Sequence, residues 1–186
     1  MKRKYVILVV ILSLITIGVS LKQMDKSDFI AEDKNYKINE LKTGTDIKYE
    51  YIIYDNNHNE IDKGTAFRTE PLMSNIDGIL QLCISAGTGL TNCRYYNLEN
   101  GKKSKWFETP ILSNNKIVVI LNRLTKPTGI IIENIFDDYS FNKKYNINFS
   151  KNEVWPLENI KFINDTIEIT YVSDNEKIET KIININ

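Results

Sequence analysis

The chain from residue 46 onward alternates apolar and polar positions over short runs, which turn-forming residues separate. In DIKYEYIIY, residues 46–54, apolar side chains fall at positions 47, 49, 51 and 53, which is the period-two pattern of a half-buried strand. Other short runs rich in β-branched and aromatic residues also predict strands. The predicted strands are 46–54, 61–67, 79–86, 90–97, 104–107, 116–121, 129–136, 145–149, 160–163, 166–172 and 177–185.

Helical periodicity is missing from the same part of the chain. Beyond Leu41, no window of helical length shows an apolar stripe with a 3.6-residue period. Many short strands without such helices predict an all-β domain built from antiparallel hairpins.

A turn pattern recurs along this domain. Four times a strand ends at an aromatic or β-branched residue, passes an Asn, Asp or Ser turn, and returns through a strand that contains lysine. The turns follow Tyr54, Tyr96, Phe136 and Val172, at intervals of 42, 40 and 36 residues by subtraction. Repeats of about 40 residues with short strands are typical of propeller blades. We therefore expect an antiparallel meander of three to four hairpin units, propeller-like or, as the alternative, a sandwich or barrel.

The first 21 residues have a different character. Lys2, Arg3 and Lys4 precede an apolar run over residues 5–21, in the order typical of a signal peptide or a signal-anchor helix. Its length lies at the lower limit for a membrane span, and both alternatives stay open. The positive-inside rule places everything after the run outside the cytoplasm. We expect residues 22–45 to be a polar linker and residues 46–186 to be an extracytoplasmic β domain.

Charge argues against a nucleic-acid partner. The chain has 24 basic and 24 acidic residues, and three of the basic ones precede the apolar run, so the rest of the chain carries an acidic excess of three. Nucleic-acid binding usually requires a clustered basic face, and this balance does not provide one.

The two cysteines are placed for a disulfide across a hairpin. Cys83 and Cys93 lie five residues either side of Thr88. In a regular antiparallel hairpin they would face each other at a Cα separation of about 4.5–5.5 Å, which a disulfide accepts. That register also sets Arg94 against Leu82, an awkward pair for a core. A one-residue bulge near the turn would instead put the cysteines on opposite faces. We expect the disulfide.

The sequence lacks the constellations of common catalytic and metal sites. His58, the only histidine, lies in the turn DNNHNE, so a Ser-His-Asp triad would have to use a residue expected to be solvated. Two cysteines without a nearby histidine fall short of the four ligands of a structural zinc site. We therefore predict no catalytic residue, no metal site and no cofactor.

Paired carboxylates are the remaining enzymatic option. Asp137 and Asp138 are adjacent, and Glu50 could act with Asp62 or Glu70. Adjacent aspartates in a predicted turn are usually turn formers, and glycosidase carboxylates must flank a cleft. A carboxylate-based hydrolase is therefore the least favoured function.

Aromatic residues offer a candidate binding surface, because such side chains are enriched among interface anchors. The residues predicted for it are Trp106, Phe107, Trp155, Asp137 and Asp138. The sequence thus favours a non-enzymatic binding protein of the bacterial cell envelope. Its expected partner is an envelope or secreted protein, with membrane attachment through residues 1–21 if they are not cleaved. The alternative is an inhibitor or immunity-type protein that acts on a secreted enzyme.

Overall fold

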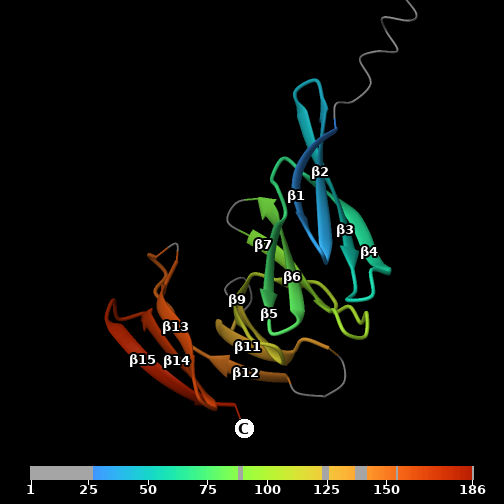
Figure 1. Cartoon of the computed structure of the whole chain (residues 1–186). Helices are drawn as coiled ribbons and strands as arrows, with labels where there is room; N and C mark the ends of the chain where they lie inside the picture. The colour runs from blue at the N-terminus through green and yellow to red at the C-terminus, as the bar shows by residue number, and fades with distance from the viewer. Residues whose placement is uncertain (1–26, 88–89, 123–125, 137–141, 154, 186) are drawn as a thin grey trace, which may run out of the picture.

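A computed structural model describes residues 27–87, 90–122, 126–136, 142–153 and 155–185, and every element in them is a β-strand (Figure 1). The strands form four antiparallel sheets, so the predicted all-β, antiparallel fold is confirmed. The first sheet contains β1 (Ser27–Asp33), β2 (Tyr36–Thr43), β3 (Asp46–Tyr54) and β4 (Glu60–Phe67). The second contains β5 (Leu72–Ile76), β6 (Ile79–Gly87), β7 (Leu90–Asn97) and β8 (Phe107–Glu108). The third contains β9 (Pro110–Ser113), β10 (Ile117–Asn122), β11 (Gly129–Asn134) and β12 (Asn142–Asn146). The fourth contains β13 (Leu157–Ile163), β14 (Thr166–Val172) and β15 (Ile178–Asn184).

Each sheet is a meander, because strands that are neighbours in the chain are also neighbours in the sheet. The four turns of the predicted repeat hold equivalent positions. They follow β3, β7, β11 and β14, and each leads into the last strand of its sheet. The fourth sheet therefore corresponds to the last three strands of the others.

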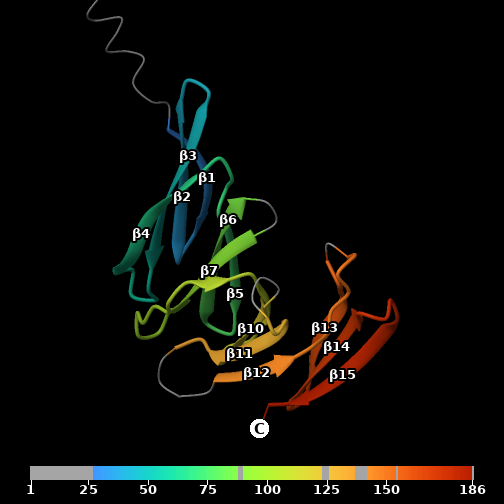
Figure 2. The same ribbon diagram turned by 180° about the vertical axis from the view of Figure 1, so that it is seen from behind.

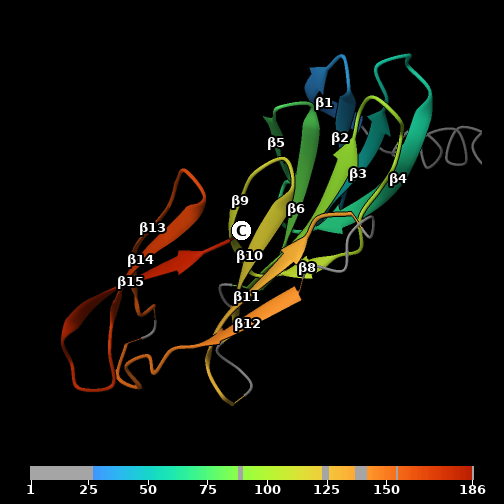
Figure 3. The ribbon, with the colours of Figure 1, turned by 90° about the horizontal axis from the view of Figure 1, so that it is seen from below.

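The sheets are stacked in chain order and form an open row. One core cluster lies between the first and second sheets, one between the second and third, and one between the third and fourth. The first and fourth sheets lie at opposite ends of the molecule (Figures 1, 2 and 3). The row therefore does not close, either into the barrel that was one predicted alternative or into the ring of a propeller.

Position in the row explains the two kinds of hydrophobic pattern. The end sheets bury one face, and β3 and β14 accordingly alternate between buried and more exposed residues. The middle sheets bury both faces. In β10, Val118 contributes to the core shared with the second sheet and Val119 to the core shared with the fourth. A strand with two buried faces has a continuous apolar sequence, as IVVIL does here.

The prediction that residues 22–45 form a polar linker is partly wrong. Residues 27–43 form the hairpin of β1 and β2, which pairs with β3. The pairing strands supply the backbone partners that these polar residues need, and Ile38 is buried in the first core. The sheet structure thus includes residues well before Asp46.

Residues 1–21, with the predicted signal or anchor helix, lie outside the described residues. Among the described residues, no helix is long and apolar enough to cross a membrane.

The cysteine hairpin adopts the regular register. Cys83 pairs with Cys93 across β6 and β7 and forms a disulfide, with the two Cα atoms 4.1 Å apart. A register shift does occur, but between Ser85 and Gly87, on the turn side of the bridge. Disulfides persist mainly in oxidising compartments, so the bridge gives weak support to an extracytoplasmic location.

Candidate functional site

Leu82 is opposite Arg94 in β6 and β7, as the regular register of the hairpin predicts. Leu82 is fully buried in the core shared with the first sheet. The guanidinium of Arg94 extends to the edge of that core and donates from Nη1 to Oδ2 of Asp62, at 3.2 Å. The arginine is therefore neutralised by a carboxylate of β4, in the neighbouring sheet.

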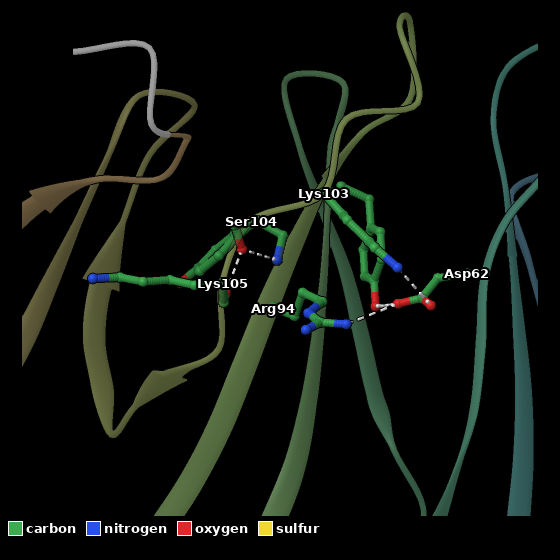
Figure 4. Close-up of polar contacts among 7 residues, drawn as sticks. Asp62, Arg94, Lys103, Ser104 and Lys105 are labelled. Carbon is green, nitrogen blue, oxygen red and sulfur yellow. Dashed lines mark hydrogen bonds and ion pairs between the residues drawn. The ribbon is translucent and has the colours of Figure 1, made fainter.

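Asp62 is the centre of a polar cluster that joins the first two sheets (Figure 4). The hydroxyl of Tyr96 donates to Oδ2 of Asp62 at 2.8 Å, and Nζ of Lys103 lies 3.3 Å from Oδ1. The Asp62 side chain is 13% exposed and that of Arg94 is 21% exposed, so water screens this ion pair only in part.

The protonation states follow from these contacts. Burial opposes ionisation of Asp62, but the hydrogen bond from Tyr96 and the cations Lys103 and Arg94 outweigh it, so the pKa of Asp62 lies below its ordinary value. Burial and the adjacent Asp62 carboxylate raise the pKa of the Tyr96 hydroxyl. The cluster is therefore a fixed arrangement of an anion, two cations and a neutral phenol at neutral pH.

The loop after β7 carries Lys103 and is fastened to its strand. The backbone amide of Tyr95 donates to Oγ of Ser104 at 3.0 Å, and Ser104 Oγ donates to the carbonyl of Lys105 at 2.7 Å (Figure 4). Ser104 is buried. This anchoring positions Lys103 toward Asp62 and also positions Trp106, which follows in the chain.

Trp106 belongs to the predicted binding surface and lies beside this cluster. It is 36% exposed, and the guanidinium carbon of Arg94 lies 4.6 Å from its ring centroid, within the range of a cation–π contact. One face of the indole is therefore taken by the Asp62 cluster.

The other residues of the predicted surface do not join Trp106. The prediction that Phe107 lies on the surface is wrong. Phe107 begins β8, and its ring is buried in the core between the second and third sheets, 2% exposed. Its ring meets Tyr95 edge to face. Trp155 is exposed, but it precedes β13 of the fourth sheet. Asp137 and Asp138 lie outside the described residues.

The carboxylate pair Glu50 and Asp62 does not converge. Asp62 is opposite Ile53 in the register of β3 and β4, whereas Glu50 is opposite Thr65. Positions 50 and 53 differ by an odd number, so their side chains leave opposite faces of the sheet. Two carboxylates on opposite faces cannot act on one bond.

His58 occupies the exposed turn predicted for it, with a φ of 63°. Asp55 organises this turn by accepting hydrogen bonds from the amides of Asn57 and Asn59, at 2.8 and 2.9 Å. A third hydrogen bond comes from the Asn59 side chain, and these bonds hold the pKa of Asp55 below its usual range. The histidine thus belongs to a structural turn. Within the described ranges, no group of three or more acidic, histidine or cysteine side chains is arranged to hold a metal ion.

The outer face of the fourth sheet carries a second group of exposed side chains, which the sequence pattern did not predict. Ile178 and Ile182 on β15 are 69% and 67% exposed, and Ile163 on β13 is 39% exposed. In β15, Ile178 and Ile182 lie on the face opposite to Ile183, which is buried against the third sheet together with Ile169 of β14. The excess of isoleucine in β15 was visible in the sequence, but which face would be covered was not.

Polar pairs lie between these isoleucines, which are on the two edge strands of the sheet. The ion pair of Lys161 with Glu168 links β13 to β14 at 2.8 Å, and Glu168 is directly opposite Ile182. The hydroxyls of Thr170 and Thr180 lie 3.3 Å apart on the same face. We call this surface, made by Ile163, Lys161, Glu168, Thr180, Ile178 and Ile182, the isoleucine face.

Comparison of the chain with protein-family models, curated proteins and solved structures finds no match.

Proposed function

We propose that this protein is a non-enzymatic binding protein of the bacterial cell envelope. Residues 1–21 hold it in the cytoplasmic membrane as a single-pass anchor, with the sheets outside. The isoleucine face binds an envelope or secreted protein.

The observation that carries the proposal is the exposure of Ile178 and Ile182, at 69% and 67%. Exposed apolar side chains that are grouped on one face and bordered by polar residues mark interaction sites. Protein–protein interfaces combine apolar anchors with polar contacts, and this face offers both, because polar side chains of β14 lie between Ile163 and Ile182.

The placement of this face fits the same function. It belongs to the sheet at the end of the row opposite residue 27, where the described chain begins (Figures 1 and 2). β15 is also an edge strand, so its outer backbone groups are open to a partner strand. An anchored protein would thus present the isoleucine face away from its membrane attachment.

Site-specific photo-cross-linking tests the proposal. The full chain is produced in its own host with a photoreactive residue in place of Ile182, and in a matched variant in place of Leu90, an exposed apolar residue of the second sheet. We expect one discrete adduct from position 182, none from position 90, and loss of the adduct when Ile178→Lys is added.

Equal labelling from both positions, or no adduct from position 182, would refute binding by this face. A secreted enzyme in the adduct, with its activity suppressed, would favour the inhibitor alternative.

A further inference from the structure

The end of the first sheet from which β1 starts has an unusual apolar exposure. The register places Ser27 opposite Leu41, Leu41 opposite Lys48, and Lys48 opposite Phe67. The first described residue therefore begins in the same cross-strand row as Phe67. The turn between β2 and β3 projects beyond this row (Figure 1).

Phe67 is on the outer face of this sheet, away from the core. Its neighbour Ala66 is buried at 2% exposure, whereas Phe67 is 66% exposed. The ring borders an open hollow that is also lined by Lys48 and Arg68 and by Thr45, Asp46 and Ile47. A phenylalanine so exposed beside two cations is not accounted for by the packing of the fold.

The distance to the predicted anchor is short. Five residues, 22–26, separate the end of the apolar run at Leu21 from Ser27. A fully extended chain advances at most about 3.6 Å per residue, so six steps cover no more than about 22 Å. If residues 5–21 span the membrane, the row that contains Phe67 is held near the lipid headgroups.

We propose that this end of the first sheet, with Phe67 at its centre, rests in the headgroup layer of the membrane. The inference depends on the membrane anchor of the proposed function and adds the orientation of the molecule. Phe67 would enter the boundary of the acyl chains, and Lys48 and Arg68 would reach lipid phosphates with their aliphatic stems along the apolar surface.

The charges at this end indicate which force dominates. Asp46 and Glu50 accompany the cations, and Glu50 lies 3.1 Å from Lys48 in an ion pair. The local charge is thus nearly balanced. Burial of the phenylalanine ring, rather than attraction to anionic lipid, provides the contact, which should therefore form on both neutral and anionic membranes.

Fluorescence depth measurements on the full chain in lipid vesicles test this contact. Because both native cysteines are in the disulfide, the single-cysteine changes Phe67→Cys and Thr45→Cys can each carry one fluorophore. Ile182→Cys, with nearly the same exposure as Phe67 at 67%, is the matched control at the far end of the row. Vesicles are made of phosphatidylcholine alone or with added phosphatidylglycerol, and each contains a headgroup nitroxide lipid.

We expect the lipid nitroxide to quench the label at position 67 or 45 severalfold more than the label at position 182, in both vesicle types. Iodide in the water should show the opposite order. Equal quenching at positions 67, 45 and 182 in protein that floats with the vesicles would overturn the membrane contact and leave the anchor standing. Failure of the full chain to float with vesicles would overturn the anchor and the contact together.

Discussion

Asp62 illustrates how one side chain determines whether two sheets can pack. It accepts hydrogen bonds from Arg94 and Tyr96 and pairs with Lys103, all from the second sheet or the loop that follows it. Without the carboxylate, the partly buried guanidinium at the edge of the core would lack a counter-charge. Buried charged groups that lose their partner destabilise a fold far more than exposed ones do.

We therefore expect Asp62→Asn to lower the free energy of unfolding by about 1–3 kcal/mol. Urea unfolding near neutral pH measures this. Glu60→Gln, two residues earlier, is the control, because Glu60 pairs with Lys63 on the exposed surface and such pairs contribute about 0–1 kcal/mol. Equal losses in the two variants would show that the Asp62 cluster does not hold the sheets together.

The same carboxylate predicts a pH dependence. The pKa of Asp62 is lowered in the folded protein, so its ionised form stabilises the fold at pH values above the unfolded pKa of about 3.9. This contribution is lost as the pH falls through the lower, folded pKa. The stability difference between the wild type and Asp62→Asn should therefore shrink progressively below about pH 4. Urea titrations over that range would contradict this if the difference stayed constant.

Gly64 is required by the ring across from it. Tyr51 is directly opposite Gly64 in β3 and β4, and a Cβ atom at position 64 would lie 2.4 Å from the Tyr51 hydroxyl oxygen and 2.6 Å from its Cζ. Because Tyr51 is buried, its ring has little room to move. We expect Gly64→Ala to cost about 1–3 kcal/mol of unfolding free energy. Thr65→Ala, at the next, exposed position, should change stability by less than about 0.5 kcal/mol, measured in the same urea assay.

At the scale of the element, the β6–β7 hairpin is stabilised by its bridge. The disulfide closes a loop with a sequence separation of 10 residues, for which the chain-entropy relation gives about 2–3 kcal/mol. We expect reduction to lower unfolding free energy by that amount, while a Cys83→Ala, Cys93→Ala double variant should not respond to the reductant. Titration of the urea-unfolded protein should find no thiol before reduction and two after it. Thiols detected before reduction would contradict the pairing.

The sequence predicted well those strands that bury one face. The predicted ranges 46–54 and 166–172 coincide with β3 and β14, because alternation is unambiguous when one face meets a core and the other meets water. Strands β1, β2, β5 and β9 were missed. Of these, β1, β5 and β9 are each the first and outermost strand of their sheet, whereas β2 is an inner strand with a mostly polar sequence, YKINELKT. Edge strands contribute little to the cores, as the mostly exposed β5 shows, so their sequences carry a weak pattern.

The candidate site was less predictable, because it depends on which sheets touch. Asp62 and Arg94 are 32 residues apart, and no local pattern says that β4 and β7 share a core. Trp106 and Phe107 are adjacent, so one points outward and the other inward, but the phase of so short a strand is not set by two residues. The continuous apolar run of β10 did contain a usable signal, because it marks a sheet in the middle of the row.

For the whole molecule, the open row has consequences for cooperativity. Each of the three core clusters joins only sheets that are neighbours in the chain. Architectures in which each unit contacts only its neighbours have stabilities that are approximately sums of unit and interface terms. The two ends of this molecule should therefore be able to unfold at different free energies, as locally opening regions do.

Two matched core truncations test this in the full chain. Ile167 is fully buried between the third and fourth sheets, and Ile38, 1% exposed, is buried between the first and second. Each Ile→Ala change should cost about 2–5 kcal/mol where it acts. We expect Ile167→Ala to speed amide hydrogen exchange in β9–β15 while β1–β4 keep wild-type rates, and Ile38→Ala to speed exchange in β1–β8 while β13–β15 are unaffected. Because no core cluster of the described residues links the first sheet to the fourth, acceleration throughout the chain in both variants would contradict the additive description. It would show that the second and third sheets transmit the loss along the row as one cooperative unit.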